Sequence, residues 1–134
     1  MGGGDSPREV VIKLFGAMER DDRAAIAHLV DLPRLMGITD HDYALQMDEP
    51  RVFYNPEDVL NDLTGDGLTK TRWFSRQRVI GSMEITGDTA LVEVTFRRKK
   101  EDTTSANVRY YTKFGLHKVN DRWRIYSFKT ISGN

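Results

Sequence analysis

The sequence predicts an α+β domain in which three N-terminal helices pack on a strongly curved antiparallel meander sheet. Near residue 68 the spacing of apolar residues changes from the 3.6-residue period of helices to the two-residue period of strands. The charge changes at the same point, since residues 1–68 hold 14 acidic and 6 basic side chains, and residues 69–134 hold 14 basic and 6 acidic ones. We therefore expect two unlike layers that pack together, with an acidic helical side and a basic sheet side.

The composition indicates one soluble globular domain. A chain of 134 residues with 39% hydrophobic residues can bury a core without disulfides or metal ions. It has no cysteine, and no pair among His28, His41 and His117 has the spacing of two metal ligands on one helix. No apolar run reaches the ~20 residues of a membrane span. We expect no cofactor or metal, and the net charge of zero disfavours nucleic acid as a partner.

The first residues predict a flexible leader over 1–5, followed by a single domain over 6–134. A glycine-rich start before a well-capped helix is what remains when a bacterial lipoprotein is cut back to just past its lipidated cysteine. The alternative is a cloning scar or a natural floppy start. We expect a cell-envelope protein, periplasmic or on the outer surface, which meets the membrane only through a removed lipid anchor. A cytoplasmic location is the second choice.

Capping signals place the helices. Ser6 and Glu9 form a capping box around Pro7, and Asn55-Pro56 gives a second strong helix start. An aspartate at 21 or 22 begins a helix that Pro33 stops. The predicted elements are helices over 7–20, over 23–30 and from 55 to the glycine turn at 65–67, with a short helix over 40–47 and a short strand over 51–54.

Alternating residues then predict four strands, over 73–86, 89–100, 106–119 and 122–131. The short links between them predict consecutive antiparallel hairpins. The alternation also assigns two faces. The inward face carries Val79, Met83, Ile85, Ala90, Val92, Val94, Phe96, Val108, Tyr110, Phe114, Leu116, Trp123 and Ile125. The outward face carries Arg76, Arg78, Glu84, Glu93, Arg97, Arg109, Tyr111, Lys113, Arg124, Tyr126 and Phe128, and by the same alternation His117.

The outward face mixes arginines with aromatic residues, the usual material of binding hot spots. The functional interpretation is a surface that binds protein, phosphate or nucleic acid, and the best version of it is a homodimer packed through the sheet face. The alternative is a solvated face whose cross-strand pairs stabilise the sheet. The interface candidates are Arg78, Arg97, Arg109, Tyr111, Arg124, Tyr126 and Phe128.

Three helices followed by a meander that ends in Val119-Asn120-Asp121-Arg122-Trp123-Arg124-Ile125 resemble the nuclear transport factor 2-like superfamily, a cystatin-like cone of helices on a curved sheet. The segments Phe15-Gly16-Ala17-Met18 and Asp21-Asp22-Arg23-Ala24-Ala25 are most similar to its bacterial lipoprotein branch, described as lumazine-binding-like or of unknown function. The resemblance implies a cone pocket. In the superfamily's enzymes, such as isomerases and dehydratases, that pocket holds a carboxylate with tyrosine or histidine partners.

No catalytic residue can be carried over from this resemblance, because the inward sheet face has no aspartate or glutamate in its middle. The densest titratable group, Asp40-His41-Asp42-Tyr43, lies on adjacent residues that point in different directions on a helix, so a solvated first turn is favoured. Aromatic residues could line the pocket instead, or could simply be core. The pocket candidates are Tyr43, Tyr54, Trp73, Tyr110 and Phe114.

These observations predict a non-enzymatic binding or accessory domain of a bacterial cell-envelope protein. It would bind a small apolar ligand or a protein partner through the cone pocket or the sheet face. The alternatives are a small-molecule enzyme of isomerase or dehydratase type that uses the cone pocket, and a homodimerisation module.

Overall fold

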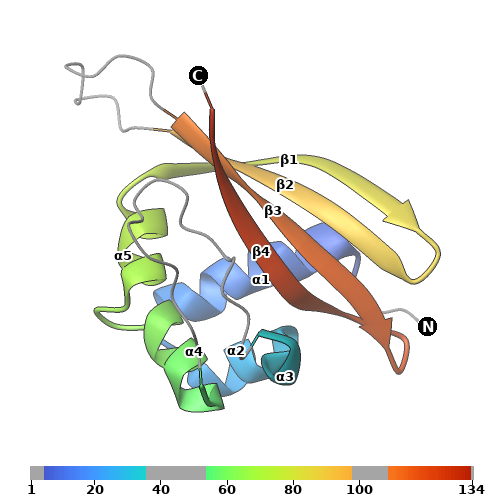
Figure 1. Cartoon of the computed structure of the whole chain (residues 1–134), viewed down its shortest axis with the longest axis horizontal. Helices are drawn as coiled ribbons and strands as arrows, with labels where there is room; N and C mark the ends of the chain where they lie inside the picture. The colour runs from blue at the N-terminus through green and yellow to red at the C-terminus, as the bar shows by residue number, and fades with distance from the viewer. Residues whose placement is uncertain (1–4, 36–53, 98–108, 134) are drawn as a thin grey trace.

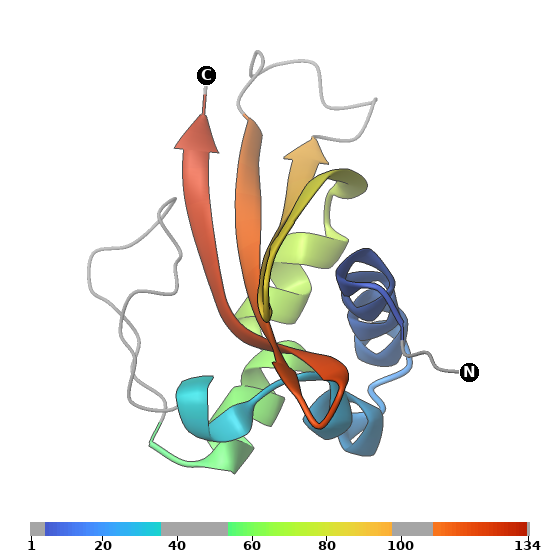
Figure 2. The same cartoon turned by 90° about the vertical axis from the view of Figure 1, so that its right-hand side faces the viewer.

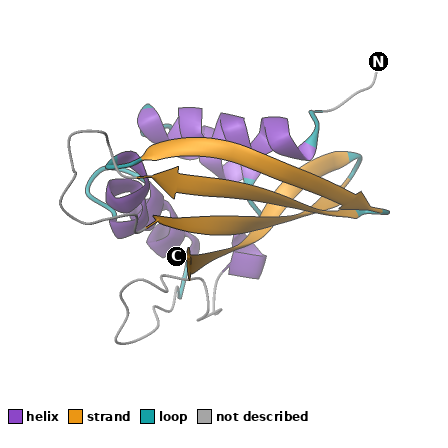
Figure 3. Cartoon of the chain, turned by 90° about the horizontal axis from the view of Figure 1, so that it is seen from above, coloured by secondary structure: helices purple, strands orange, loops and turns teal. Residues whose placement is uncertain are grey.

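The structure, a computed structural model, describes residues 5–35, 54–97 and 109–133. A layer of helices packs on a four-stranded antiparallel sheet of order β1-β2-β3-β4 (Figure 1), which confirms the predicted α+β meander. The strands bend and twist along their length (Figure 2), and the longest helix runs along one side of them (Figure 3). The elements are α1 (Pro7–Glu19), α2 (Arg23–Leu29), α3 (Leu32–Leu35), α4 (Pro56–Leu63), α5 (Leu68–Phe74), β1 (Gln77–Thr86), β2 (Thr89–Arg97), β3 (Arg109–Val119) and β4 (Arg122–Gly133).

Some predictions fall outside the described residues. They are the leader at 1–4, the helix over 40–47, the strand over 51–53, and the strand ends at 98–100 and 106–108. The described residue Tyr54 precedes α4 and is not part of a strand. Among the described residues, no helix is long and apolar enough to cross a membrane.

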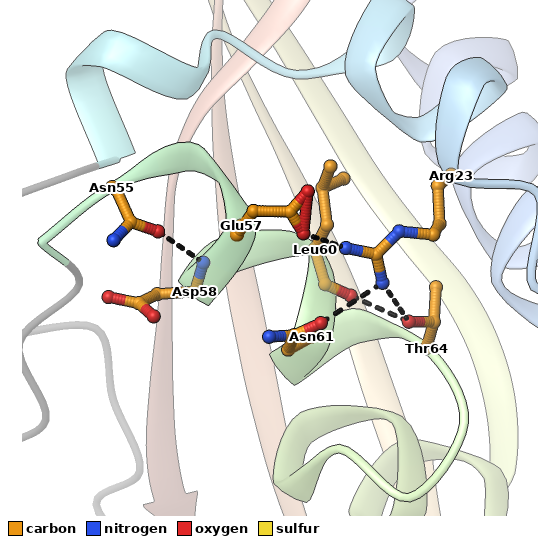
Figure 4. Close-up of polar contacts among 7 residues, drawn as sticks. All are labelled: Arg23, Asn55, Glu57, Asp58, Leu60, Asn61 and Thr64. Carbon is orange, nitrogen blue, oxygen red and sulfur yellow. Dashed lines mark hydrogen bonds and ion pairs between the residues drawn. The ribbon is translucent and has the colours of Figure 1, made fainter.

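The helix starts follow the capping signals. The Ser6 hydroxyl accepts a hydrogen bond from the Glu9 backbone N–H at 3.2 Å, and the Glu9 carboxylate accepts one from the Ser6 N–H at 2.8 Å. This reciprocal pair satisfies two backbone donors at the start of α1. The Asn55 side chain accepts in the same way from the Asp58 N–H at 3.0 Å and begins α4 (Figure 4).

Two helices were not predicted. α3 follows Asp31, whose carboxylate accepts from the Arg34 N–H at 3.3 Å, so Pro33 lies inside a short helix instead of only ending the one before. α5 occupies residues where the first strand was predicted to begin at Trp73. The buried carboxylate of Asp62 satisfies a free backbone donor in the first turn of α5. It accepts hydrogen bonds from the backbone N–H and the hydroxyl of Thr69. A buried acceptor from α4 therefore overrides the weak local preference for a strand.

Gly67 makes this α4–α5 connection possible. A Cβ atom at this position would lie 2.2 Å from the carbonyl oxygen of Asn61, a distance that no side chain can adopt. The close approach brings the start of α5 back against the end of α4, where Asp62 can reach Thr69.

Two irregularities in the sheet reverse the alternation of side chains. The β1–β2 register shifts between Ile80 and Met83, and the β3–β4 register shifts at Gly115, which pairs with Ser127, while Leu116 pairs with Ile125. Tyr126 is therefore an extra residue in β4. At the first shift, the Arg8 guanidinium of α1 donates to the Gly81 carbonyl of the outermost strand at 3.2 Å.

These shifts correct several predicted faces. Phe128 was predicted to point outward, but it is buried at 2% exposure, because the extra residue at Tyr126 restores the inward side three positions after Ile125. In β1 the assignment is also wrong before the shift. Arg78 lies on the helix side, and Val79, predicted to be core, is 37% exposed. Ile85 lies opposite Ala90 as predicted, but near the strand end it is half exposed.

Arg78 occupies the junction of both layers. Its guanidinium lies 4.1 Å from the centre of the Phe74 ring and donates to the backbone carbonyls of Trp73 and Arg76, each at 3.0 Å. Partial burial lowers the pKa of Arg78 from its ordinary value, while Glu19 opposes this change. This arginine therefore supports the fold and is not available as an outer-face interface residue.

A cluster of aromatic rings fills the space between the layers. Trp73 of α5 stacks on Phe96 of β2, with ring centres 5.6 Å apart and planes 19° apart. It also meets three further rings edge-on or at steep angles, namely Phe15 of α1 at 5.7 Å, Phe114 of β3 at 5.4 Å and Phe128 of β4 at 5.5 Å. Such pairs each contribute about 0.5–1.5 kcal/mol beyond the burial of area.

Polar contacts fasten the helices to one another. The Arg23 guanidinium at the start of α2 bridges to α4, where it pairs with Glu57 and donates to Asn61 at 3.1 Å and to Thr64 at 3.2 Å (Figure 4). Asp21, in the preceding turn, accepts from the Gly65 N–H at 2.8 Å and from the Lys70 ammonium at 2.9 Å. The connection between α1 and α2 is thereby tied to the one between α4 and α5.

We predict that Gly67→Ala lowers the free energy of unfolding by at least ~2 kcal/mol, because the backbone must move to relieve the overlap with Asn61. Gly16→Ala is the matched control. It lies in α1, and its added Cβ would meet only the flexible end of Arg20 at 3.4 Å, so we expect a gain of about 0.5–1 kcal/mol. Urea unfolding of both variants measures the difference, and equal stabilities would contradict this account of the α4–α5 connection.

A second prediction concerns pH. The hydrogen bond from Gly65, followed by that from Lys70, lowers the pKa of Asp21 below its ordinary value of 3.8. A carboxyl group whose pKa is lowered by folding stabilises the fold above its unfolded pKa, and this contribution is lost as the pH falls through the folded value. Asp21→Asn, which suits the left-handed backbone at φ 54°, should therefore reduce stability at neutral pH.

The difference between this variant and the parent should disappear at pH well below 3.8. Urea unfolding across the acid range measures it. Asp66→Asn, an exposed change in the same α4–α5 connection, is the control. If the loss of stability in Asp21→Asn stayed constant with pH, the lowered pKa of Asp21 would not be the cause of that loss.

Candidate functional site

The interior candidates behave as core residues where they are described. Trp73 and Phe114 are buried and contact each other within the aromatic cluster. Tyr54 is 80% exposed, so the structure does not bring it to them. Tyr43 lies outside the described residues, and of Tyr110 the structure describes the backbone position in β3 but not the side chain. The lining of a ligand pocket by these residues stays a prediction.

The buried polar side chains of the described interior are Asp62, Thr64, Thr69 and Thr112. Asp62 is the one carboxylate in this group, and its oxygens are engaged by Thr69 at the start of α5. A carboxylate that acts as a general base must lie within hydrogen-bond reach of the substrate proton that it removes. Asp62 instead completes the α4–α5 turn, so its chemistry in this structure is that of a helix cap.

The outer face of the sheet, turned away from the helices, is the second candidate. Val79 of β1 and Leu91 of β2 are large apolar side chains on this face, 37% and 47% exposed. Beside Leu91 the face is hollowed by a cavity of ≈ 150 Å³. Its lining residues are Ser82, Glu84, Leu91, Val92, Glu93 and Lys113. The hollow forms where the β1 register shift displaces Ser82 toward Glu93, whose side chains approach to 3.5 Å.

Several predicted interface residues lie on this outer face. Tyr111 and Arg124 are half-buried, and Arg97 is exposed at the end of β2. The structure describes the backbone position of Arg109 in β3 but not its side chain. As described above, Phe128 and Arg78 lie on the helix side instead. The remaining candidate, Tyr126, belongs to a cluster of four side chains at the other end of the β3–β4 pair.

We call Asp31, Arg34, His117 and Tyr126 the His117 cluster. The imidazole Nε2 of His117 lies 2.8 Å from the Asp31 carboxylate, and its ring centre lies 5.1 Å from that of Tyr126. The Arg34 guanidinium covers the Tyr126 ring at 4.7 Å. The side chains of His117 and Asp31 are 22% and 14% exposed, so the pair is partly shielded from water.

The segment between α2 and α3 brings Asp31 to this place. Val30 forms a parallel bridge with Ile125 of β4, and the Asp31 N–H donates to the Ile125 carbonyl at 2.7 Å. Val30 is buried on the core side, so the alternation of an extended segment places Asp31 on the outer side. There its carboxylate accepts both from the Arg34 N–H and, when ionised, from His117.

Gly115 forms the floor beneath the Tyr126 ring. A Cβ atom at Gly115 would lie 3.2 Å from the Tyr126 ring and 2.7 Å from the Ser127 hydroxyl. The ring therefore rests on bare backbone, an arrangement in which an aromatic side chain covers a glycine in a neighbouring strand.

The cluster can orient a histidine and present positive charge. A carboxylate at Nε2 fixes the orientation of the ring, and it leaves Nδ1 for another partner. The sequence placed His117 on the outer face and included Tyr126 among the candidates, and the structure agrees with both placements. Asp31 and Arg34 were missed. The available signal was the spacing of Asp31 before Pro33, which marks a helix cap but does not reveal a partner 86 positions away.

No family model and no curated protein sequence matches the chain. Solved structures do. An NTF-2-like protein of unknown function from Silicibacter pomeroyi is 16% identical, with 93% of this chain and 91% of that one covered and a TM-score of 0.60. An NTF2-like protein of unknown function from Shewanella baltica is 13% identical, with 94% of this chain and 90% of that one covered and a TM-score of 0.59. IdmH of Streptomyces antibioticus, for which a polyketide cyclase activity has been proposed, is 15% identical. The match covers 97% of this chain and 94% of that one, with a TM-score of 0.56.

The chain therefore has the nuclear transport factor 2-like fold, a layer of helices on a curved antiparallel sheet, as the sequence resemblance predicted. Identities of 13–16% establish the fold and no more. The similarity to the lumazine-binding-like lipoprotein branch stays a prediction.

We predict that Gly115→Ala destabilises the protein by about 1–3 kcal/mol, because the added methyl group displaces Tyr126 and Ser127. The displacement should also change the NMR shifts of the His117 ring, which lies against Tyr126. Thr95→Ala, a change of a half-buried outer-face residue in β2, serves as the control and should leave the His117 signals in place. Unchanged His117 shifts in Gly115→Ala would contradict the packing described here.

Proposed function

We propose that this protein is a non-enzymatic binding or accessory domain of a bacterial cell-envelope protein, and that it binds its partner through the outer face of the sheet. One observation carries the proposal. Leu91 and Val79 expose apolar surface on that face beside a hollow of ≈ 150 Å³, although a sheet face that meets only water would expose polar residues there.

The packing of the inner face supports this choice over the cone pocket. Between the helices and the sheet, Trp73 and four phenylalanine rings lie against one another at 5.4–5.7 Å from the indole, as in a protein core. The described side chains on this face are thus committed to packing. The hollow and the titratable His117 cluster lie on the outer face instead.

An isomerase or dehydratase that uses the cone pocket is the alternative from the enzyme class. An enzymatic activity, that of a polyketide cyclase, has been proposed for IdmH, which has a similar fold. This alternative requires a carboxylate next to a tyrosine or histidine inside the cone. Within the described interior the carboxylate is Asp62, which is occupied by Thr69.

The homodimerisation module would use the same outer face, so the size of the particle separates it from a binding domain. Sedimentation at tens of micromolar is the measurement. A monomer favours a different partner, whereas a stable dimer that Leu91→Asp dissociates would assign the face to a second copy of this chain. The cell-envelope location is tested separately, by a lipobox cysteine encoded directly upstream of Gly2.

The proposal predicts that Leu91→Asp abolishes association with a native partner while Ile12→Asp does not. Both residues are aliphatic and nearly equally exposed, at 47% and 49%, but Ile12 lies on α1 in the helical layer. Each variant and the parent would be used to purify associated proteins from an envelope extract of the native cells. Equal recovery by both variants would exclude the outer face as the binding surface.

A further inference from the structure

The two layers differ in how their charges are used. In the helical layer, four acidic residues are paired within the chain, through Lys13–Asp5, Arg20–Asp22, Arg23–Glu57 and Lys70–Asp21. On the β3–β4 side of the outer face, no ion pair joins Arg34, Lys113 or Arg124 to any residue that the structure describes. These three cations therefore have no described carboxylate to compensate them, and they lie on the outer face.

Two of these cations, Arg34 and Arg124, lie beside the rings of Tyr126 and His117. Arg34 covers Tyr126, which lies beside His117, and Arg124 stands directly opposite His117 in the β3–β4 register. Arg124 is the cross-strand neighbour of His117, whose own partner is the Asp31 carboxylate, while no ion pair joins Arg124 to a described residue. Asp31 holds His117 in this position. A carboxylate supplied from outside would therefore find Arg124 without a described carboxylate partner.

The apolar hollow is within reach of the same place. Leu91 pairs with Gly115, and Gly115 pairs with Ser127 next to Tyr126, so hollow and cluster are separated by two strand spacings. Two spacings amount to about 10 Å, which an extended peptide covers in roughly three residues. A single short segment can therefore contact both.

We propose that the outer face binds an acidic extended segment of a partner protein, with carboxylates at Arg34 and Arg124 and an apolar side chain in the hollow beside Leu91. The inference rests on the proposed function, since it names the partner's chemistry for the same face. Arginine favours carboxylates because its planar guanidinium can donate two parallel hydrogen bonds to them. The tyrosine beneath Arg34 holds that guanidinium in place and so lowers the entropic cost of binding.

The charge pattern favours a protein segment over an anionic membrane. Glu84 and Glu93 line the hollow on the β1–β2 side of the same face. A flat lipid surface would have to approach these two carboxylates together with the basic side, and anionic headgroups would repel them. A short segment can place acids on the basic side only.

The test uses the full chain and the peptide acetyl-Gly-Leu-Gly-Glu-Glu-Glu-Gly-amide as probe, titrated by NMR at low salt. Two matched peptides replace the three glutamates by glutamines or the leucine by glycine. We expect shift changes at Gly115 and His117, at least fivefold weaker binding of the glutamine peptide, and weaker binding of the peptide without leucine. Binding to vesicles of phosphatidylglycerol is measured in parallel, to compare an anionic membrane with the peptide.

Arg34→Gln and Arg124→Gln should each weaken binding of the glutamate peptide about two- to fivefold, as expected for partly exposed charge pairs. Lys113→Gln removes a positive charge of the same face outside the His117 cluster. It therefore tests the role of positive charge even if either arginine variant disturbs that cluster. Arg20→Gln, in the helical layer, should have no effect. Circular dichroism confirms that each variant is folded.

No binding of the glutamate peptide, equal binding of its glutamine version, or vesicle binding that exceeds peptide binding would each overturn the proposal. The peptide experiment can fail while Leu91→Asp still abolishes recovery of a native partner. That combination would leave the outer face as the binding surface and reject only the acidic segment. If Leu91→Asp has no effect on the native partner, the proposed function itself fails.

Discussion

The packing of Trp73 against rings from both layers is the interaction on which the rest of the structure depends. The indole comes from α5 and reaches α1 through Phe15 and the sheet through Phe96, Phe114 and Phe128. It can do so because Asp62 starts α5 at the right place. One residue thereby fixes the distance between the helical layer and three of the four strands. It also commits the inner face to apolar packing, which leaves polar chemistry to the outer face.

The two register shifts decide which side chains that outer face presents. The extra residue in β4 places Tyr126 over Gly115 and returns Phe128 to the core. Without it, strict alternation would exchange the two faces of the strand beyond this point. The bulge therefore serves both sides of the sheet at once, since it supplies a ring to the aromatic cluster and another to the His117 cluster.

The sequence predicted the features that depend on neighbouring residues. Ser6 and Asn55 cap helices through contacts three positions away, and the hairpins follow from short links between alternating strands. It failed where a distant group decides. Trp73 was assigned to a strand because Asp62 was not recognised as the cap of α5, and Phe128 was placed outward because a bulge leaves no local mark. The Asp31–His117 pair joins residues 86 positions apart, so it could not be predicted from either neighbourhood.

The bond from Arg8 to the carbonyl of Gly81 has a consequence for the free edge of the sheet. β1 is the outermost strand on that side, and such a strand offers its unpaired backbone groups to any extended chain it meets. Here the register shift interrupts the strand between Ile80 and Met83, and the arginine occupies an acceptor at the interruption. An incoming strand could pair only with short stretches on either side. The arrangement protects the protein against growth into cross-β aggregates through this edge.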